Sequence, residues 1–80
     1  MKVKNIWNIV LQSWDRNGQE NHYSIDSFTH QDEAMVTFNK RMEEDKDKQG
    51  FEKTPDANEY YYDYEDGGFA RVIVLESKLY

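Results

Sequence analysis

The stretch of sequence that decides the fold is residues 59–79, EYYYDYEDGGFARVIVLESKL. Aromatic and β-branched residues, which favour strands, fill both of its ends. In the middle, Asp66-Gly67-Gly68 supplies residues that accept a positive φ at a tight turn. The pattern predicts a long β-hairpin with a two-residue loop, centred on Asp66-Gly67 or on Gly67-Gly68.

Such a loop places even-numbered residues of the first arm beside odd-numbered residues of the second. One face of the hairpin would then be core, and would carry Tyr60, Tyr62, Tyr64, Phe69, Ile73 and Leu75. The opposite face would carry Glu59, Tyr61, Asp63 and Glu65 beside Ala70, Val72 and Val74. We therefore expect an apolar strip edged with carboxylates on this second face.

The first part of the chain predicts another hairpin. Residues 3–14 are rich in Trp, Ile and Val, and both alternating sets of positions are largely apolar, as in a strand covered on two sides. Asn17-Gly18 is a strong signal for a type I′ turn, and residues 22–28 return as the second strand. Pairing about this turn sets Leu11 near Ser24, Trp7 near Phe28, Val10 near Ile25 and Gln12 near Tyr23.

One helix follows this hairpin. Thr29 is its expected N-cap, with Asp32 as the reciprocal residue of a shortened capping box. An apolar stripe at helical spacing is formed by Ala34, Met35, Phe38 and Met42, whereas Val36 lies off it. The remaining positions are charged, and the helix is expected to end near Gly50, a suitable C-terminal cap.

These elements predict an α+β fold with the element order β-β-α-β-β. A small four-stranded, mainly antiparallel sheet carries one helix packed on one face, and the chain forms a single domain, residues 1–80. The first and last strands look central, which favours the strand order 2-1-4-3 with those two strands adjacent and parallel. The order 2-1-3-4 is the alternative.

One helix with a narrow stripe covers only one face of such a sheet. The uncovered face would show an apolar surface larger than monomers usually expose, with Ile6, Val10, Trp14, Val72 and Val74 at its centre and Tyr23, Ile25 and Tyr61 around them. A second copy of the chain is the expected cover, because two-fold symmetric dimers are the commonest oligomers. The sequence therefore predicts a homodimer.

The net charge of the chain limits which kinds of partner it is expected to bind. The net charge is −6 at pH 7, and residues 56–66 contain acids but no Lys or Arg. Nucleic acid and anionic membranes select basic surfaces, so neither is expected to bind the chain directly. The chain has no cysteine, no signal-peptide core and no membrane span, which fits the reducing cytoplasm.

The acidic, tyrosine-rich arm, residues 56–66, is the candidate binding site. We expect it to meet a basic protein surface through Glu59, Tyr61, Asp63, Glu65 and Asp66. Under the alternative interpretation the carboxylates only protect an edge strand from aggregation. A site of tyrosine modification is a weaker third interpretation.

The sequence indicates neither a metal site nor a catalytic centre. Residues 15–20 contain ligand types but lack EF-hand spacing, and His22 and His30 accompany no zinc motif. Asp26, Asp63 and Glu65 are the acids considered for a carboxylate pair, but no catalytic motif surrounds them. We therefore expect no enzyme activity, no catalytic residues, no metal and no cofactor.

In composition alone, this short, acidic, cysteine-free and aromatic-rich chain resembles the small inhibitors encoded by bacteriophages and mobile elements. Such anti-CRISPR and anti-restriction proteins often occupy a nuclease's DNA site with carboxylates. The resemblance implies a protein-binding inhibitor in a bacterial cytoplasm and assigns no residue. The alternative function is a structural or scaffolding homodimer whose acidic arm only confers solubility.

Overall fold

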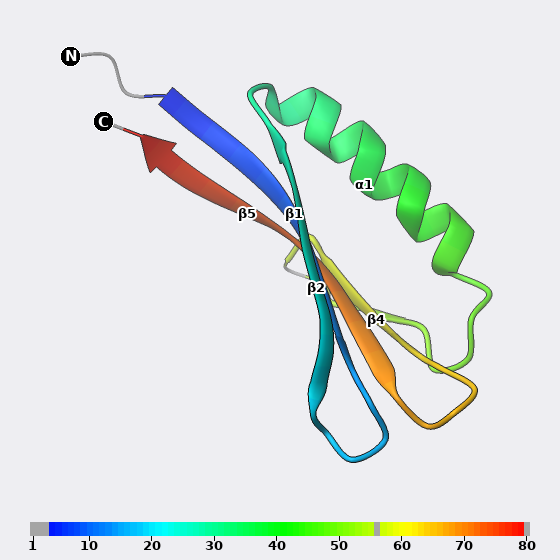
Figure 1. Cartoon of the computed structure of the whole chain (residues 1–80). Coiled ribbons are helices and arrows are strands. Elements are labelled where there is room, and N and C mark those ends of the chain that lie inside the picture. The colour runs from blue at the N-terminus through cyan, green and yellow to red at the C-terminus, as the bar shows by residue number, and fades with distance from the viewer. Residues whose placement is uncertain (1–3, 56, 80) are drawn as a thin grey trace.

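The computed structural model describes residues 4–55 and 57–79 of the chain. Five strands form one sheet and a single helix lies across one of its faces (Figure 1). The elements in chain order are β1 (Lys4–Trp14), β2 (Glu20–Phe28), α1 (Gln31–Asp45), β3 (Glu52–Lys53), β4 (Glu59–Asp63) and β5 (Phe69–Leu79). The chain is thus a small α+β protein, but its sheet has five strands rather than the four predicted.

The first hairpin forms with the predicted register. Val10 pairs with Ile25 and Leu11 with Ser24, and the same alignment runs along most of β1 and β2. At the turn, the Asp15 carboxylate accepts hydrogen bonds from the backbone N–H groups of Asn17 and Gln19, at 2.9 and 3.0 Å. The predicted type I′ turn was wrong. The Asp15 N–H donates to the Gln19 carbonyl at 2.9 Å, which leaves residues 16–18 as a three-residue loop, and Gly18 alone in this loop has a positive φ, of 82°. A register shift between Ser13 and Trp14 compensates the extra loop residue and gives the predicted pairing along the rest of the hairpin.

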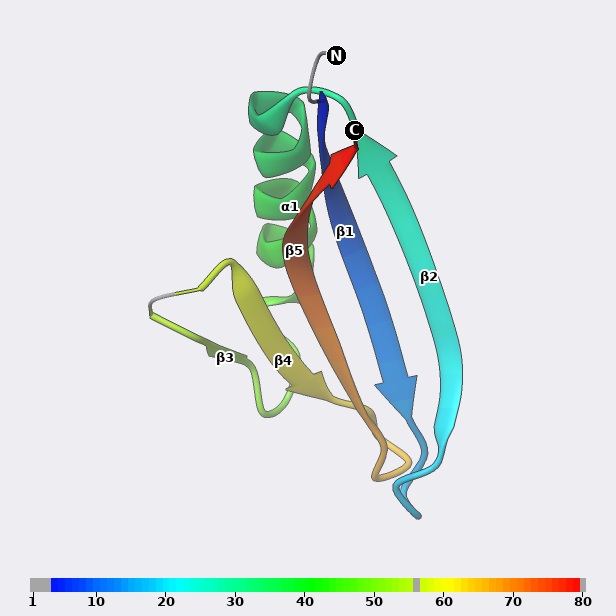
Figure 2. The ribbon, with the colours of Figure 1, turned by 90° about the vertical axis from the view of Figure 1, so that its left-hand side faces the viewer.

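The sheet order is β2-β1-β5-β4-β3. The four long strands therefore lie in the predicted order, but the prediction that the terminal strands are parallel was wrong, because β1 and β5 pair antiparallel over their whole length. The reason is β3, which sequence reasoning missed. Helix α1 brings the chain back to the end of the sheet where the first hairpin turns. β3 then runs away from that end, so β4 runs toward it and β5 away from it, each opposite to its predicted direction (Figure 2).

The second hairpin has a three-residue loop, not the predicted two-residue one. The Tyr64 N–H donates to the Gly68 carbonyl at 2.7 Å, which leaves residues 65–67 as the loop. Tyr60 therefore pairs with Val72, and Tyr62 with Ala70. Adding one residue to the loop moves every side chain of one arm to the other face, so the predicted division between the faces was wrong for β5.

The helix buries the predicted stripe against the sheet. Ala34 and Phe38 are fully buried, and Met35 and Met42 pack against the core. Val36, predicted off the stripe, is 69% exposed. The predicted ends of the helix were wrong. His30 occupies the N-cap without a side-chain hydrogen bond, in place of Thr29, and the helix ends at Asp45, before Gly50.

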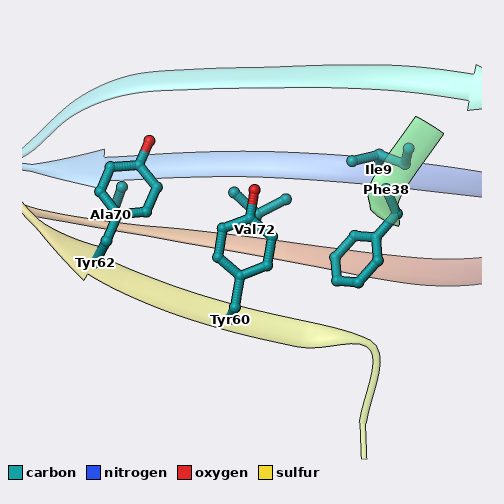
Figure 3. Packing of buried hydrophobic residues seen from close by; sticks show 6 residues of the cluster. All are labelled: Ile9, Phe38, Tyr60, Tyr62, Ala70 and Val72. Carbon is teal, nitrogen blue, oxygen red and sulfur yellow. The ribbon is translucent and has the colours of Figure 1, made fainter. Parts of the chain in front are cut away.

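The core lies between α1 and the face of the sheet that α1 covers. Its buried members are Ile9, Phe38, Tyr60, Tyr62, Ala70 and Val72 (Figure 3). The ring of Tyr60 lies over Val72 and that of Tyr62 over Ala70, because these small side chains of β5 leave space for the rings. We call the opposite side of the sheet the helix-free face.

Candidate functional site

The even-numbered tyrosines of the acidic arm lie on the core face of the sheet, as predicted. Tyr60 is fully buried, and its ring centroid lies 5.4 Å from those of both Phe38 and Phe51. Tyr62 is buried beside it, at 6.2 Å, and Tyr64 meets the edge of Tyr62 at 5.6 Å. Alternation along β4 therefore leaves Tyr61 as the tyrosine of this strand on the helix-free face.

Glu59, the first carboxylate predicted to meet a partner, is already occupied within the chain. Its side chain is only 10% exposed, and it accepts a hydrogen bond from the Arg71 guanidinium at 2.5 Å and from the Thr54 hydroxyl at 3.1 Å. Tyr61 lies directly opposite Arg71 on the neighbouring strand. Glu59 is thus a structural residue of the helix-free face, and its negative charge is compensated by Arg71.

Two opposing effects set the charge state of this group. Burial raises the pKa of the Glu59 carboxyl, but hydrogen bonds from Arg71, Tyr61 and Thr54 outweigh burial and hold the pKa below its ordinary value. Hydrogen bonding to Glu59 in turn raises the pKa of the Tyr61 phenol. The pair therefore stays as carboxylate and neutral phenol at neutral pH, with no group poised to exchange a proton.

The other carboxylates predicted for the site, Asp63, Glu65 and Asp66, lie in or next to the loop between β4 and β5. Both hairpins turn at this end of the sheet (Figure 2). Asp47, Asp63 and Glu65 line a shallow depression of about 360 Å³, and Asp66 follows in the same turn. All four are exposed. We call these four residues the acidic turn end. Within residues 4–55 and 57–79, no ion pair involves any of them.

The backbone that holds the acidic turn end is closely packed. A Cβ placed on Gly68 would lie 2.4 Å from the Trp14 carbonyl oxygen, and one on Gly67 would lie 3.2 Å from the Arg16 Cβ. The turn of the second hairpin therefore rests on that of the first. The Asp66 carboxylate also accepts a hydrogen bond from the Gly68 N–H at 3.0 Å, which fixes the loop.

Three cations lie near the acidic turn end. Lys46 precedes Asp47, but its ammonium group pairs with the Glu43 carboxylate at 2.7 Å. Lys48 lines the depression, but its ammonium group is 3.2 Å from the Asp45 carboxylate and 4.4 Å from the centre of the Tyr62 ring. Its charge is therefore directed toward Asp45. Arg16 is exposed on the adjacent turn. Because four carboxylates outnumber these cations, this end of the molecule keeps an excess of negative charge.

The predicted second-face residues divide between the two faces. Ile6, Val10 and Trp14 lie on the helix-free face, as predicted. Val72 and Val74 were wrongly placed: Val72 is buried in the core and Val74 packs against that core. Their positions on the helix-free face are taken by Phe69, Ile73 and Leu75, a direct result of the three-residue loop.

The helix-free face is partly closed by its own side chains. Val10 lies between Ile25 and Ile73 and is 5% exposed, and Trp14 stacks on Phe69 with ring centroids 4.8 Å apart. Sequence reasoning missed this stack, which depends on the antiparallel pairing of β1 with β5, and the Arg71 partner of Glu59, which depends on the β4–β5 register. Large apolar side chains that stay exposed on this face are Tyr23, Ile25, Phe69 and Leu75.

Neither a metal site nor a membrane span emerges from the described part of the chain. Among residues 4–55 and 57–79 there is no group of three or more His, Asp or Glu side chains placed to hold a metal ion. No helix in the same residues is long and apolar enough to cross a membrane. Comparison with family models, with curated proteins and with solved structures found no match to this chain.

Proposed function

We propose that this chain is a non-enzymatic protein-binding module that docks its acidic turn end on a basic protein surface. In its most specific form, the protein is an inhibitor of the kind encoded by bacteriophages and mobile elements. It works in a bacterial cytoplasm and occupies the nucleic-acid-binding surface of a nuclease or another DNA-handling protein. The four exposed carboxylates on a fixed backbone are the observation that supports this proposal.

The geometry changes which residues are proposed to carry the binding. Asp63, Glu65 and Asp66 keep the role predicted from the sequence, because they are exposed and no ion pair within the described residues uses them. Asp47 joins them through the shared depression. Glu59 and Tyr61 leave the set, because Glu59 compensates Arg71 and Tyr61 lies directly opposite Arg71, beside this ion pair.

Charge complementarity explains how such a site would work. Exposed carboxylates contribute little to stability, so their concentration at one end has a small folding cost and is available for recognition. They would steer a basic partner toward the turn end and raise its association rate, an effect that salt screens. Two packed hairpin turns hold the carboxylate-bearing backbone in place, so docking would require little ordering.

The test compares two triple variants with the same change in charge. Asp63→Asn, Glu65→Gln and Asp66→Asn remove charge at the acidic turn end. Asp32→Asn, Glu33→Gln and Glu44→Gln remove as much from exposed positions of α1. Each variant competes with duplex DNA for a panel of CRISPR and restriction nucleases at two salt concentrations.

We expect the turn-end variant to lose at least about tenfold in inhibition, and the helix variant to stay close to wild type. Inhibition by the wild type should also weaken as salt rises. Equal inhibition by both variants at both salt concentrations would contradict the acidic turn end as the binding site. Failure of the wild type against the whole panel would contradict the specific nuclease proposal.

The alternative function, a scaffolding homodimer, has a separate observation in its favour. Tyr23 and Ile25 on β2, and Phe69 and Leu75 on β5, are between 39% and 52% exposed on the helix-free face. In this case the carboxylates would act only against aggregation. The turn-end variant would then dimerise as the wild type does and would only be less soluble.

A further inference from the structure

The two edges of the sheet are built differently. On one side the sheet ends at β3, which is two residues long, contains Lys53 and is followed by Thr54-Pro55. A short strand, a lysine and a proline are the usual means of preventing an edge from pairing with another chain. On the other side the sheet ends at β2, which is nine residues long. In Figure 2 nothing lies beyond β2 on its outer side.

Strand β2 lacks the protection that β3 has. Its sequence, ENHYSIDSF, contains neither proline nor lysine. Glu20 lies at the very start of the strand, and the Asp26 carboxylate is turned toward α1, where it forms an ion pair with Arg41. The unpaired backbone groups along its outer side are therefore open to a further strand.

Apolar side chains are exposed along the same edge. Tyr23 and Ile25 point to the helix-free face, where they are 52% and 48% exposed. His22, Ser24 and Asp26 alternate with them on the helix side. An added strand would cover both exposed apolar residues and satisfy the backbone groups at once.

We propose that the partner of this edge is a second copy of the chain, with β2 paired antiparallel to β2 of the partner subunit about a two-fold axis at Ser24. The two sheets then join into one, with both helices on the same side. Tyr23 lies opposite Ile25 of the partner subunit, and His22 lies opposite Asp26 of the partner subunit. Both pairs occur twice because of the symmetry.

The side chains along β2 complement one another, which favours a second copy of the chain as the partner and the pairing about Ser24. Aromatic and β-branched residues opposite each other, and an imidazole opposite a carboxylate, are favourable cross-strand pairs. Centring the pairing on Asp26 would oppose two carboxylates. Centring it on Tyr23 would oppose Glu20 to Asp26 of the partner subunit, and centring it on Ile25 would set Tyr23 against Ser27 of the partner subunit and lose the Tyr–Ile pairs. The pairing about Ser24 keeps those pairs and opposes no two carboxylates, and it sets Glu20 against Phe28 of the partner subunit only at the two ends of the paired strands.

The proposed dimer is independent of the acidic turn end and compatible with it. The antiparallel arrangement sends the turns of the two copies to opposite ends of the joined sheet. Six residues separate Ser24 from Gly18, so the two first-hairpin turns would stand roughly 40 Å apart at about 3.4 Å per residue. Both acidic turn ends would remain exposed.

A pair of lysine variants with matched exposure tests the interface. Ile25 and Leu75 are both 48% exposed on the helix-free face, but Ile25 lies on the edge strand and Leu75 on the central strand β5. Sedimentation of the wild type at micromolar concentrations should give about twice the monomer mass of 9.6 kDa. Ile25→Lys should weaken the dimer by about tenfold or more, and Leu75→Lys should not. Circular dichroism checks that both variants stay folded.

Cross-linking tests the register, and the chain has no cysteine of its own to interfere. Ser24→Cys should form a covalent dimer under mild oxidation, because only residues directly opposite across two strands come within disulfide distance. His22→Cys and Asp26→Cys should each stay monomeric on a denaturing gel, but a mixture of the two should form a covalent heterodimer.

Several outcomes would overturn the proposal. A wild type that stays monomeric at all measured concentrations excludes the dimer. Dissociation by Leu75→Lys as strong as that by Ile25→Lys moves the interface to the sheet face. Cross-linking of His22→Cys alone, as fast as that of Ser24→Cys, excludes the register about Ser24. None of these outcomes affects the nuclease assay of the acidic turn end.

Discussion

The hydroxyl of Tyr60 donates a hydrogen bond to the carboxylate of Asp45 at 2.7 Å, and so joins the second residue of β4 to the last residue of α1. A carboxylate at the C-terminal end of a helix is unfavourable beside the helix dipole, and the last turn of α1 contains no basic residue. Tyr60 and Lys48 compensate this charge from outside the helix. The contact therefore couples helix docking to the burial of a tyrosine in the core.

Removing the hydroxyl should destabilise the fold measurably. Tyr60→Phe keeps the buried ring but loses the bond to Asp45, and we expect the free energy of unfolding to fall by about 1–2 kcal/mol. Tyr23→Phe is the control, because Tyr23 is 52% exposed and should change stability by less than about 0.5 kcal/mol. Urea denaturation measures both. Equal stability of the two variants would show that the Tyr60 bond contributes nothing.

The buried phenols predict how the protein responds to alkali. Burial, and then hydrogen bonding to Asp45, raises the pKa of Tyr60, and burial and then Tyr64 raise that of Tyr62. In the unfolded chain both phenols ionise near pH 10. Because the native pKa values are higher, the stability that these groups contribute is complete below about pH 10 and is lost as the pH rises further. Absorbance at the phenolate band should increase for Tyr60 and Tyr62 only together with unfolding measured by circular dichroism.

The first hairpin could be predicted because several signals agreed. Asn17-Gly18 locates the turn, and the apolar residues on either side of it fit one register. The loop is nevertheless one residue longer than predicted, and the shift between Ser13 and Trp14 restores the predicted register. In the second hairpin, Asp66-Gly67-Gly68 accommodates a loop of two or three residues equally well in sequence terms. The hydrogen bond from the Gly68 N–H to the Asp66 carboxylate accompanies the longer loop. Because strand side chains alternate with a period of two, that single residue reversed the faces of β5.

Two further features of the structure could not be predicted from the sequence, each for a physical reason. Glu52–Lys53 is too short to show any periodicity, yet it sets the direction of β4 and β5. The Glu59–Arg71 pair arises only with the three-residue loop, since the predicted register places Arg71 on the face opposite Glu59. Glu65 and Asp66 are exposed because turns lie at the surface in any register, although Glu65 lies in the loop and not on the strand arm where it was predicted.

The Glu59–Arg71 pair should contribute to stability. A double-mutant cycle with Glu59→Gln and Arg71→Met should give a coupling of about 1–2 kcal/mol at neutral pH, because Glu59 is mostly buried whereas Arg71 is one-third exposed. The exposed pair Asp26–Arg41 serves as the control, with an expected coupling below about 1 kcal/mol.

The same pair predicts a loss of stability in acid. The native pKa of Glu59 is lowered, so its contribution is present above the unfolded-state value near 4.5 and is lost as the pH falls through the native pKa. Unfolding measurements between neutral pH and pH 3 should therefore show a smaller acid dependence in Glu59→Gln than in the wild type. An unchanged dependence would assign the acid sensitivity to other carboxylates.

The contact between the two hairpin turns can be tested with two glycine substitutions, of which only the one at Gly68 creates a steric collision. A methyl group on Gly68 would collide with the Trp14 carbonyl at 2.4 Å, and a backbone atom cannot move aside as a flexible side chain can. Gly18 has a φ of 82° but nothing within 4 Å of its Cβ position, so Gly18→Asn adds no collision and uses a residue that tolerates this conformation.

We expect Gly68→Ala to lower the free energy of unfolding by about 2 kcal/mol or more, and Gly18→Asn by less than about 1 kcal/mol. The collision would separate β5 from β1 at the point where Trp14 stacks on Phe69. Gly68→Ala should therefore also weaken the near-ultraviolet circular dichroism of the tryptophans, and Gly18→Asn should preserve it. A stable Gly68→Ala variant with an unchanged tryptophan signal would mean that the two turns do not touch, and that the backbone beneath the acidic turn end is not held by this contact.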